Sequence, residues 1–423
     1  MREIKVVIGK NFGDEGKGAI VNLLCRNQKA LVVRGNGGAQ AGHTVEEGSF
    51  RFVFHQLGSG SLQGCPVFWS KYFLPDLYKL GEEAEQFDAE RAQLEETEGR
   101  TWDKTLPIIY ADPECACVTI YDVLLNNVVE YLRGESRHGS CGMGIFEAVC
   151  RSKQTEYALC LGDFADCDES QIAERLKKIR DGYVKPRIKT LLADAHGGKS
   201  AIEVMSSQYD SELGNWIELM EDDNIPWNAA RIMCDNFKNL VRLADWKKLS
   251  PQYERIVFEN AQGLMLDWDN EEYSPHLTAS YTGLRNVSEM LKQTEQMDFS
   301  TLELCYVTRT YVTRHGAGRL DHECAREEIN PALYDLTNVY NPWQGNLRYG
   351  KHPSGENFFR YIRQDMKWLE EIAAAPQTTL YLTHLDETDG KVLFDDEEMP
   401  VEKFDAICQE YGIRLQIFKE RFF

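Results

Sequence analysis

The sequence predicts an α/β fold with a large, mainly parallel central sheet and helices on both faces. Two observations carry this prediction. Short apolar runs rich in β-branched residues, Ile4–Ile8 and Ala30–Val33, each lead into a glycine-rich loop, and the first loop opens an apolar helix, Ala19–Cys25. The pattern returns at Arg255–Glu259 and Leu304–Thr308, which also end in polar loops. Polar groups at the ends of buried strands are typical of the ligand-binding edge of open α/β sheets.

Composition restricts the class of protein. A chain of 423 residues with 43% apolar content can bury a large core. The net charge of −21 disfavours nucleic acids and anionic membranes as partners, because the overall field repels both. We find no apolar run long enough to span a membrane and no secretion signal, and the 12 cysteines then indicate reduced thiols. We therefore expect a soluble, cytoplasmic protein.

The first loop, Gly9–Gly18, predicts an anion cradle. It joins a strand to a helix N-terminus, where free backbone amides and the helix dipole attract phosphate, and Lys17 adds a cation. The P-loop pattern is not met, because Asn11 replaces its first glycine and a glycine replaces its final Ser or Thr. We therefore expect a P-loop-NTPase-like cradle. Asp14 and Glu15 lie inside it, and carboxylates beside phosphates indicate a cation or a proton-transfer step.

Two further loops are rich in glycine. The stretch Arg34–Thr44 ends on a His-Thr pair, which favours a ligand role for His43. His138–Ile145 could hold a second phosphate, or it could be an ordinary surface turn. Between them and the later strands, residues 168–248 show the spacing of amphipathic helices. Because no linker or repeat interrupts the chain, we expect one domain over residues 1–423 with a helical insertion around 168–248.

Taken together, the loops resemble those of the adenylosuccinate synthetase family, which joins a purine nucleotide to L-aspartate using GTP. The family segments G-D-E-G-K-G, N-A-G-H-T, E-G-A-Q-G, T-R-V-G-A-G and T-K-L-D are matched in order by Gly13–Gly18, Gln40–Thr44, Glu259–Gly263, Thr313–Gly318 and Thr383–Asp386. The resemblance implies the family's fold over nearly the whole length. It also implies a homodimer.

The resemblance further implies a reaction in two steps. Asp14 would take the N1 proton of the purine so that O6 attacks the γ-phosphate, and His43 would stabilise the transfer as hydrogen-bond donor and acid. The amine of aspartate would then displace phosphate from C6. Lys17 would neutralise the transferring phosphate, and the Asp14 carboxylate with the Gly42 carbonyl would hold Mg²⁺.

The nucleotide-binding residues that the resemblance implies come from all of the matched loops. They are Gly13, Glu15, Gly16, Gly18, Gln40, Gly42, Thr44, Ser140, Cys141, Gln262, Thr278, Arg314 and Asp386. Ser140, Cys141 and Thr278 would hold the phosphate of a purine nucleoside monophosphate. Gln262 would bind its base or ribose region, and Asp386 would read the base of the triphosphate.

Two departures from the family concern charged side chains. The aspartate loop V-T-G-R-x-R-R is replaced by residues 337–350, where Arg348 keeps one guanidinium and Asn346 stands in place of another. Since two planar guanidinium groups hold a dicarboxylate best, another amine donor remains open. In the phosphate loop Met143 replaces an arginine, and Arg151 is a candidate for the arginine that reaches across the dimer.

The substrates are open at this point. The Asp386 carboxylate could accept the N1–H and 2-amino donors of guanine, which favours GTP over ATP. Trp343–Arg348 resembles a segment of phage-type members that act on dGMP, but as that branch tends to lose the loop aspartate, Asp14 favours IMP. A purine-nucleotide sensor without turnover is the alternative outside catalysis, and the altered aspartate loop favours it.

Overall fold

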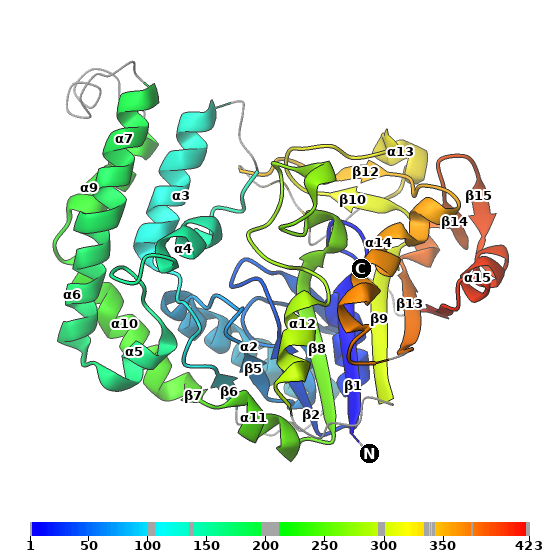
Figure 1. Cartoon of the computed structure of the whole chain (residues 1–423), viewed down its shortest axis with the longest axis horizontal. Coiled ribbons are helices and arrows are strands. Elements are labelled where there is room, and N and C mark those ends of the chain that lie inside the picture. The colour runs from blue at the N-terminus through cyan, green and yellow to red at the C-terminus, as the bar shows by residue number, and fades with distance from the viewer. Residues whose placement is uncertain are drawn as a thin grey trace.

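Strand β1 (Glu3–Gly9) lies inside a nine-stranded sheet whose pairings are all parallel. Its two neighbours are β8 (Arg255–Gly263) and β9 (Leu302–Arg309), as Figure 1 shows. The computed structural model describes residues 2–99, 106–134, 139–195, 211–294, 301–333, 338, 340, 343–373 and 375–419. Across the sheet the strands run in the order β16 (Arg414–Ile417), β13 (Gln377–Thr383), β9, β1, β8, β2 (Ala30–Arg34), β5 (Val67–Trp69), β6 (Ile109–Ala111) and β7 (Val241–Leu243). The predicted parallel α/β sheet is confirmed.

Both faces of the sheet are covered. Successive residues of a strand point to opposite faces, and in β1 Val7 joins one buried cluster while Val6 and Ile8 join another. The Val7 cluster includes side chains of α1 (Lys17–Cys25) and α2 (Leu77–Glu98). The other cluster is built on the helices later in the chain. The predicted layers of helix, sheet and helix are therefore confirmed.

The other helices and strands surround this sheet. The helices are α3 (Ile120–Arg133), α4 (Ile145–Ser152), α5 (Leu161–Asp166), α6 (Glu169–Ile179), α7 (Lys185–Ala195), α9 (Ser211–Glu221), α10 (Ile225–Leu240), α11 (Trp246–Leu249), α12 (Arg285–Lys292), α13 (Arg326–Ile329), α14 (Glu356–Met366) and α15 (Val401–Glu410). The small sheets pair β3 (His43–Glu47) with β4 (Phe50–Phe54), β14 (Lys391–Leu393) with β15 (Glu398–Pro400), and β12 (Arg348–Gly350) with both β10 (Val312–Arg314) and β11 (Glu323–Cys324).

The helical region has other limits than the sequence suggested. Helices α3 and α4 stand beside α6, α7 and α9 in Figure 1, so this region begins well before residue 168. At its other end Leu243, which the periodicity assigned to a helix, lies in β7, the edge strand of the large sheet. Short edge strands carry too few residues to display a period of two. That the whole chain forms one domain stays a prediction.

Among the described helices, none combines the length and the apolar character that crossing a membrane requires. The cytoplasmic location stays a prediction.

A buried carboxyl in α14 makes stability depend on pH. Asp365 accepts hydrogen bonds from the Leu284 amide at 2.7 Å and the Tyr306 hydroxyl at 2.9 Å, and burial raises its pKa to about 7. A carboxyl whose pKa rises on folding stabilises the protein at low pH, and this contribution is lost as pH increases through the folded value. We expect Asp365 to remove about 3–4 kcal/mol from the free energy of unfolding between roughly pH 4 and 8.

Urea denaturation of the wild type and of Asp365→Asn across this pH range checks the prediction. The difference in the free energy of unfolding between the two proteins should grow in favour of the variant as pH rises. Parallel pH profiles would contradict it.

Candidate active site

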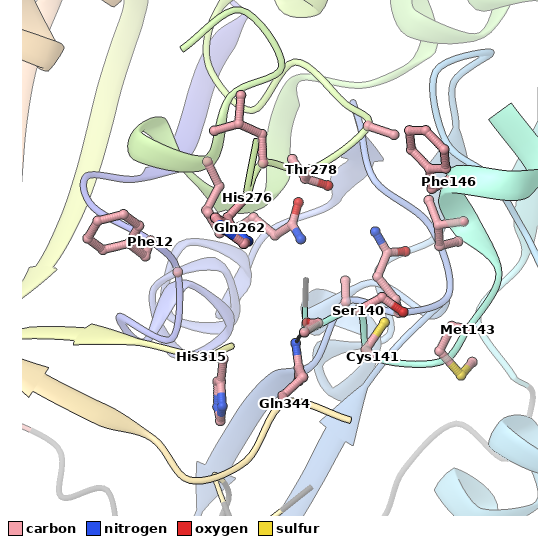
Figure 2. A pocket seen from close by; sticks show the side chains of 18 of the residues that line it. Phe12, Ser140, Cys141, Met143, Phe146, Gln262, His276, Thr278, His315 and Gln344 are labelled. Atoms are coloured by element: carbon pink, nitrogen blue, oxygen red, sulfur yellow. Dashed lines mark hydrogen bonds between the residues drawn. The ribbon is translucent and has the colours of Figure 1, made fainter. Parts of the chain in front are cut away.

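A pocket of about 540 Å³ lies at the carboxyl ends of the central strands. Figure 2 shows Gln262, His276 and Thr278 on one side of it and Ser140 and Cys141 on the other. Most of the predicted site residues line this one pocket. They are Gly13, Asp14, Lys17, Gln40, Gly42, His43, Ser140, Cys141, Gln262, Thr278 and Arg314.

The first loop presents Asp14 to the pocket through an unusual backbone. Asp14 has a φ of 57°, in the left-handed region that Asp tolerates better than most residues. Its carbonyl oxygen accepts a hydrogen bond from Nε of Arg309 at 2.6 Å. Its carboxylate lies 3.7 Å from Nε2 of His315, a ring that also contacts Oδ1 of Asn338 at 3.0 Å. The Asp14 carboxylate is 29% exposed, so a ligand can reach it.

The side chains of Lys17 and Glu15 both lie close to Gly9, and Lys17 also lines the pocket. A Cβ on Gly9 would lie 2.9 Å from Nζ of Lys17 and even nearer to the Glu15 carboxylate, so glycine is required where β1 ends. Burial raises the pKa of Glu15 to about 7, although Lys17 and two hydrogen bonds from Asn11 oppose the shift. Burial also lowers the pKa of Lys17. A bound anion would favour the charged form of Lys17.

His43 belongs to a buried dyad. Its Nδ1 lies 2.7 Å from Oε1 of Glu259. The same oxygen accepts a hydrogen bond from the Ser59 hydroxyl, and Oε2 of Glu259 accepts one from the Ser59 backbone amide. Burial would raise the pKa of Glu259, but His43, Arg34 and Ser59 together lower it to about 2. Burial lowers the pKa of His43 to about 4 in spite of the Glu259 charge.

The dyad therefore holds an ionised carboxylate and a neutral imidazole near pH 7. Since a carboxylate only accepts, the proton is assigned to Nδ1 of His43, which leaves Nε2 without one. To act as the predicted acid, His43 must first take up a proton. An anion in the pocket would raise its pKa and favour that uptake. Glycine at position 18 allows α1 to lie close to His43, because a Cβ there would lie 3.0 Å from Cβ of His43.

The third glycine loop faces these groups across the pocket. The Ser140 hydroxyl donates to Oδ1 of Asn126 at 3.0 Å and accepts from the Gly142 amide at 3.2 Å. Gln344 donates to the Gly139 carbonyl at 3.0 Å, the contact drawn as a dashed line in Figure 2. This loop therefore lines the pocket and is not an ordinary surface turn. Its binding of a phosphate stays a prediction.

Several predicted residues do not line the pocket. Glu15 is buried behind the loop, Gly16 and Gly18 begin α1, Thr44 lies in β3, and Asp386 is exposed after β13. The predicted aspartate-binding pair lies outside it as well. Asn346 is exposed.

Arg348 already has partners. Its guanidinium contacts Glu323 at 2.6 and 2.8 Å and donates to the carbonyls of Gly316 and Gly318 at 3.1 and 2.8 Å. The pairing of β12 with β11 sets Arg348 beside Glu323, a consequence of strand register that a linear motif does not carry. To bind a dicarboxylate, Arg348 would first have to leave Glu323.

The expectation for Arg151 is wrong. Its side chain is fully buried, contacts Asp122 at 2.8 and 2.9 Å, and donates to the carbonyls of Tyr157 and Cys117. These internal bonds use all of its nitrogens, so Arg151 joins α4 to α3 and cannot reach a second subunit. The predicted homodimer itself stays a prediction.

Three residues without a predicted role contact the predicted catalytic groups. Glu259 holds His43, Arg309 holds the Asp14 backbone, and His315 faces the Asp14 carboxylate. Arg309 ends β9 and His315 directly follows β10, and a position at a strand end is the signal that could have identified these two. Glu259 lies within β8, where no such signal marks it.

The oxygen donors of the first two loops fit a magnesium ion. Asp14 and Gly42 line the same pocket, and they supply a carboxylate and a backbone carbonyl, which are ligand types that Mg²⁺ accepts together with phosphate oxygens and water. Glu15 supplies a second carboxylate in the first loop, and its Oε2 is buried without a hydrogen-bond partner. The metal role of Asp14 and Gly42 stays a prediction.

Comparisons with known proteins identify the family of this chain. The family model for adenylosuccinate synthetase matches residues 6–340. The adenylosuccinate synthetase of Vibrio vulnificus is 28% identical over 397 residues, which cover 91% of this chain and 77% of that protein. That of Teredinibacter turnerae is 28% identical over 319 residues, which cover 74% of this chain but only 63% of the relative's length.

Two solved structures share the fold. The fully ligated adenylosuccinate synthetase from Plasmodium falciparum superposes with a TM-score of 0.60 at 18% identity, over 92% of this chain and 78% of that one. The cyanophage S-2L succinoaminodeoxyadenylate synthetase, bound to dGMP and to dATP as an energy donor, gives 0.57 at 13% identity, over 99% and 92%.

Proposed function

The chain belongs to the adenylosuccinate synthetase family, and from this premise we propose that it is a ligase. It joins L-aspartate to C6 of a purine nucleotide and uses a nucleoside triphosphate to activate that carbon. The observation that carries the proposal is the convergence of Asp14, Lys17 and His43 on one pocket. Storage or sensing of a nucleotide needs no base and no acid beside the cradle.

In the first step the pocket would activate an oxo group, which is a poor leaving group. Asp14 accepts the N1 proton, O6 of the purine bonds to the γ-phosphorus, and the bond to the leaving nucleoside diphosphate breaks. Lys17 compensates charge on the transferring phosphoryl group. His43 takes up a proton as the phosphates enter and donates it through Nε2, while Glu259 holds Nδ1 and stabilises the imidazolium.

In the second step the amine of aspartate attacks C6 and phosphate leaves with its bonding electrons. The proton lost from nitrogen must go to a base in the pocket or to water. A Mg²⁺ ion held by Asp14 and Gly42 would supply charge compensation for the triphosphate. The carboxylates of aspartate would be held by Arg348 once its pair with Glu323 opens, with Asn346 beside it.

The triphosphate that we propose is GTP. Asp386 follows β13 and is exposed, so its carboxylate is free to receive the two N–H donors of guanine. We expect Asp386→Asn to lower kcat/KM for GTP about 10- to 100-fold, because a charged hydrogen-bond acceptor is worth about 1.5–3 kcal/mol, and to leave ATP little affected. Initial rates with both triphosphates check this, and an equal loss for both would contradict it.

The acceptor that we propose is IMP. A second candidate is dGMP or GMP, giving the 2-amino analogue of the product, and the likeness to the cyanophage enzyme with dGMP bound supports it. Gln262 lies in the pocket with its backbone at a φ of 63° and a buried Oε1 that lacks a partner, and either purine could satisfy this oxygen. Asp14 can take the N1 proton of either purine, but phage-type members tend to lose the loop aspartate, so its presence here favours IMP.

Phosphate release with GTP, ATP or dATP tests the proposal. Each is combined with IMP, GMP or dGMP, with and without L-aspartate, and the succinylated product is identified by mass spectrometry. Product that requires a purine monophosphate and aspartate together supports the ligase. Tight nucleotide binding without turnover would favour the sensor, and phosphate release that needs no purine monophosphate would favour an ordinary triphosphatase.

A further inference from the structure

A series of three hydrogen bonds, of which the middle one is buried and the outer two are partly buried, links the segment after β13 to the backbone of Asp14. Nε of Arg309 donates to the Asp14 carbonyl at 2.6 Å, and Nη1 of Arg309 contacts the Tyr311 hydroxyl at 2.8 Å. That hydroxyl donates to Oε2 of Glu387 at 2.5 Å. Glu387 lies in the turn Leu385–Thr388, the same turn that carries Asp386.

This series of hydrogen bonds crosses the ends of three adjacent strands. Asp14 follows β1, Arg309 ends β9, and Glu387 follows β13, and these strands stand next to one another in the sheet and in Figure 1. A second link runs in parallel, because Thr383 at the end of β13 donates to the Glu15 carbonyl at 3.0 Å. The first loop is therefore attached at two consecutive carbonyls to the strand ends beside it.

The two residues in the middle of this hydrogen-bond series, Arg309 and Tyr311, are shielded from water. Arg309 is 3% exposed and Tyr311 is 0% exposed. Burial, together with the facing Glu387 carboxylate, raises the pKa of Tyr311 well above its ordinary range in spite of Arg309, so the hydroxyl keeps its proton. Hydrogen bonds to charged groups are strong in such surroundings, and leaving one partner unpaired is costly.

The Asp14 backbone needs this support. A residue other than glycine is held in the left-handed region only when its surroundings fix it, and Asp14 sits there at a φ of 57° between Gly13 and Glu15. The direction of its carboxylate follows from its backbone. Small errors in the placement of a catalytic group can lower a rate by about 100-fold.

We propose that Arg309 and Tyr311 are positioning residues that hold Asp14 in its productive orientation and tie it to the turn expected to read the triphosphate base. The inference rests on the proposed function for its catalytic consequence. Its structural part, the anchoring of the loop, stands on the hydrogen bonds themselves.

Tyr311→Phe tests the proposal, since it removes the hydroxyl and keeps the ring. We expect kcat to fall about 10- to 100-fold with KM for the triphosphate changed less than about threefold. Amide hydrogen exchange in peptides covering residues 10–17 should become faster in the ligand-free variant.

Tyr306→Phe is the matched control. Tyr306 is also fully buried and lies in β9, the strand that ends shortly before Tyr311, but its hydroxyl donates to Asp365 at 2.9 Å, away from the loop. Tyr306→Phe removes one buried hydroxyl, as Tyr311→Phe does. A merely structural effect should therefore appear in both variants, whereas the proposal expects faster exchange at residues 10–17 and the fall in kcat in Tyr311→Phe alone.

The two readouts separate the possible failures. Unchanged exchange at residues 10–17 in Tyr311→Phe would overturn the positioning role, whatever the wild type catalyses. Equal effects of both variants would overturn it as well. If exchange rises in Tyr311→Phe alone while the wild type forms no product with any acceptor, the anchoring stands and the proposed function fails.

Discussion

Asp14→Asn is expected to lower product formation about 10²- to 10⁴-fold, the range typical of removing a positioned base. The Asn amide cannot take the N1 proton of the purine, and without that transfer O6 is a poor nucleophile. Asn is a better replacement than Ala here, because Asn also tolerates the left-handed backbone at a φ of 57°. The loss is then chemical and not conformational.

Steady-state rates and equilibrium binding of GTP by the variant measure this effect. Binding should stay within about tenfold of the wild type, because Asp14 contributes one carboxylate and the amides of the cradle remain. Asp389→Asn is the control, since Asp389 has the same kind of backbone at a φ of 50° but is exposed and outside the pocket. Turnover by Asp14→Asn close to that of the wild type would remove Asp14 from the mechanism.

Lys17→Met is expected to separate activity from stability. Removing the cation that faces the transferring phosphate should lower kcat about 10²- to 10³-fold, as does the loss of one preorganised donor elsewhere. The free energy of unfolding of the ligand-free protein should not fall. Burial lowers the pKa of Lys17, which means that folding disfavours its charge, and methionine fills a similar volume without that cost.

Lys10→Met is the matched control for this prediction. Lys10 is also buried, and burial lowers its pKa to about 7, but it lies behind the loop, with Nζ 3.7 Å from the centre of the Phe358 ring. It does not line the pocket. Its loss should leave phosphate transfer far less affected than the loss of Lys17. Equal losses of activity, or a large loss of stability in Lys17→Met alone, would show that Lys17 is a structural ion.

Much of the candidate site could be predicted because its signals are local. The first loop reads as a cradle within ten residues, and its Asp14 and Lys17 do line the pocket. His43 could be predicted for the same reason, from a short glycine-rich stretch. What these motifs could not give is the partner of each group. Glu259 lies 216 residues from His43, and Arg309 lies 295 residues from Asp14.

The fold supplies partners that the sequence does not reveal. Strand pairing sets Glu323 beside Arg348, whose role in binding a dicarboxylate stays a prediction. Arg151 was expected at an interface, and Asp122 holds it inside the protein. A linear motif does not show which opposite charge the fold places beside a charged side chain. Such a side chain is therefore easily predicted to bind a ligand or a second subunit when it is already paired within the protein.

The sequence by itself determined the parallel sheet, the order of its loops and the family, because hydrophobic period and glycine turns act over a few residues. The tertiary structure alone decided which groups meet and in which protonation state they meet. Desolvation depends on everything packed around a side chain, so the neutral His43 and the raised pKa of Glu15 follow from burial. Glu259 is ionised in spite of burial, because His43, Arg34 and Ser59 together lower its pKa. Chemistry at this site depends on those states as much as on the residues themselves.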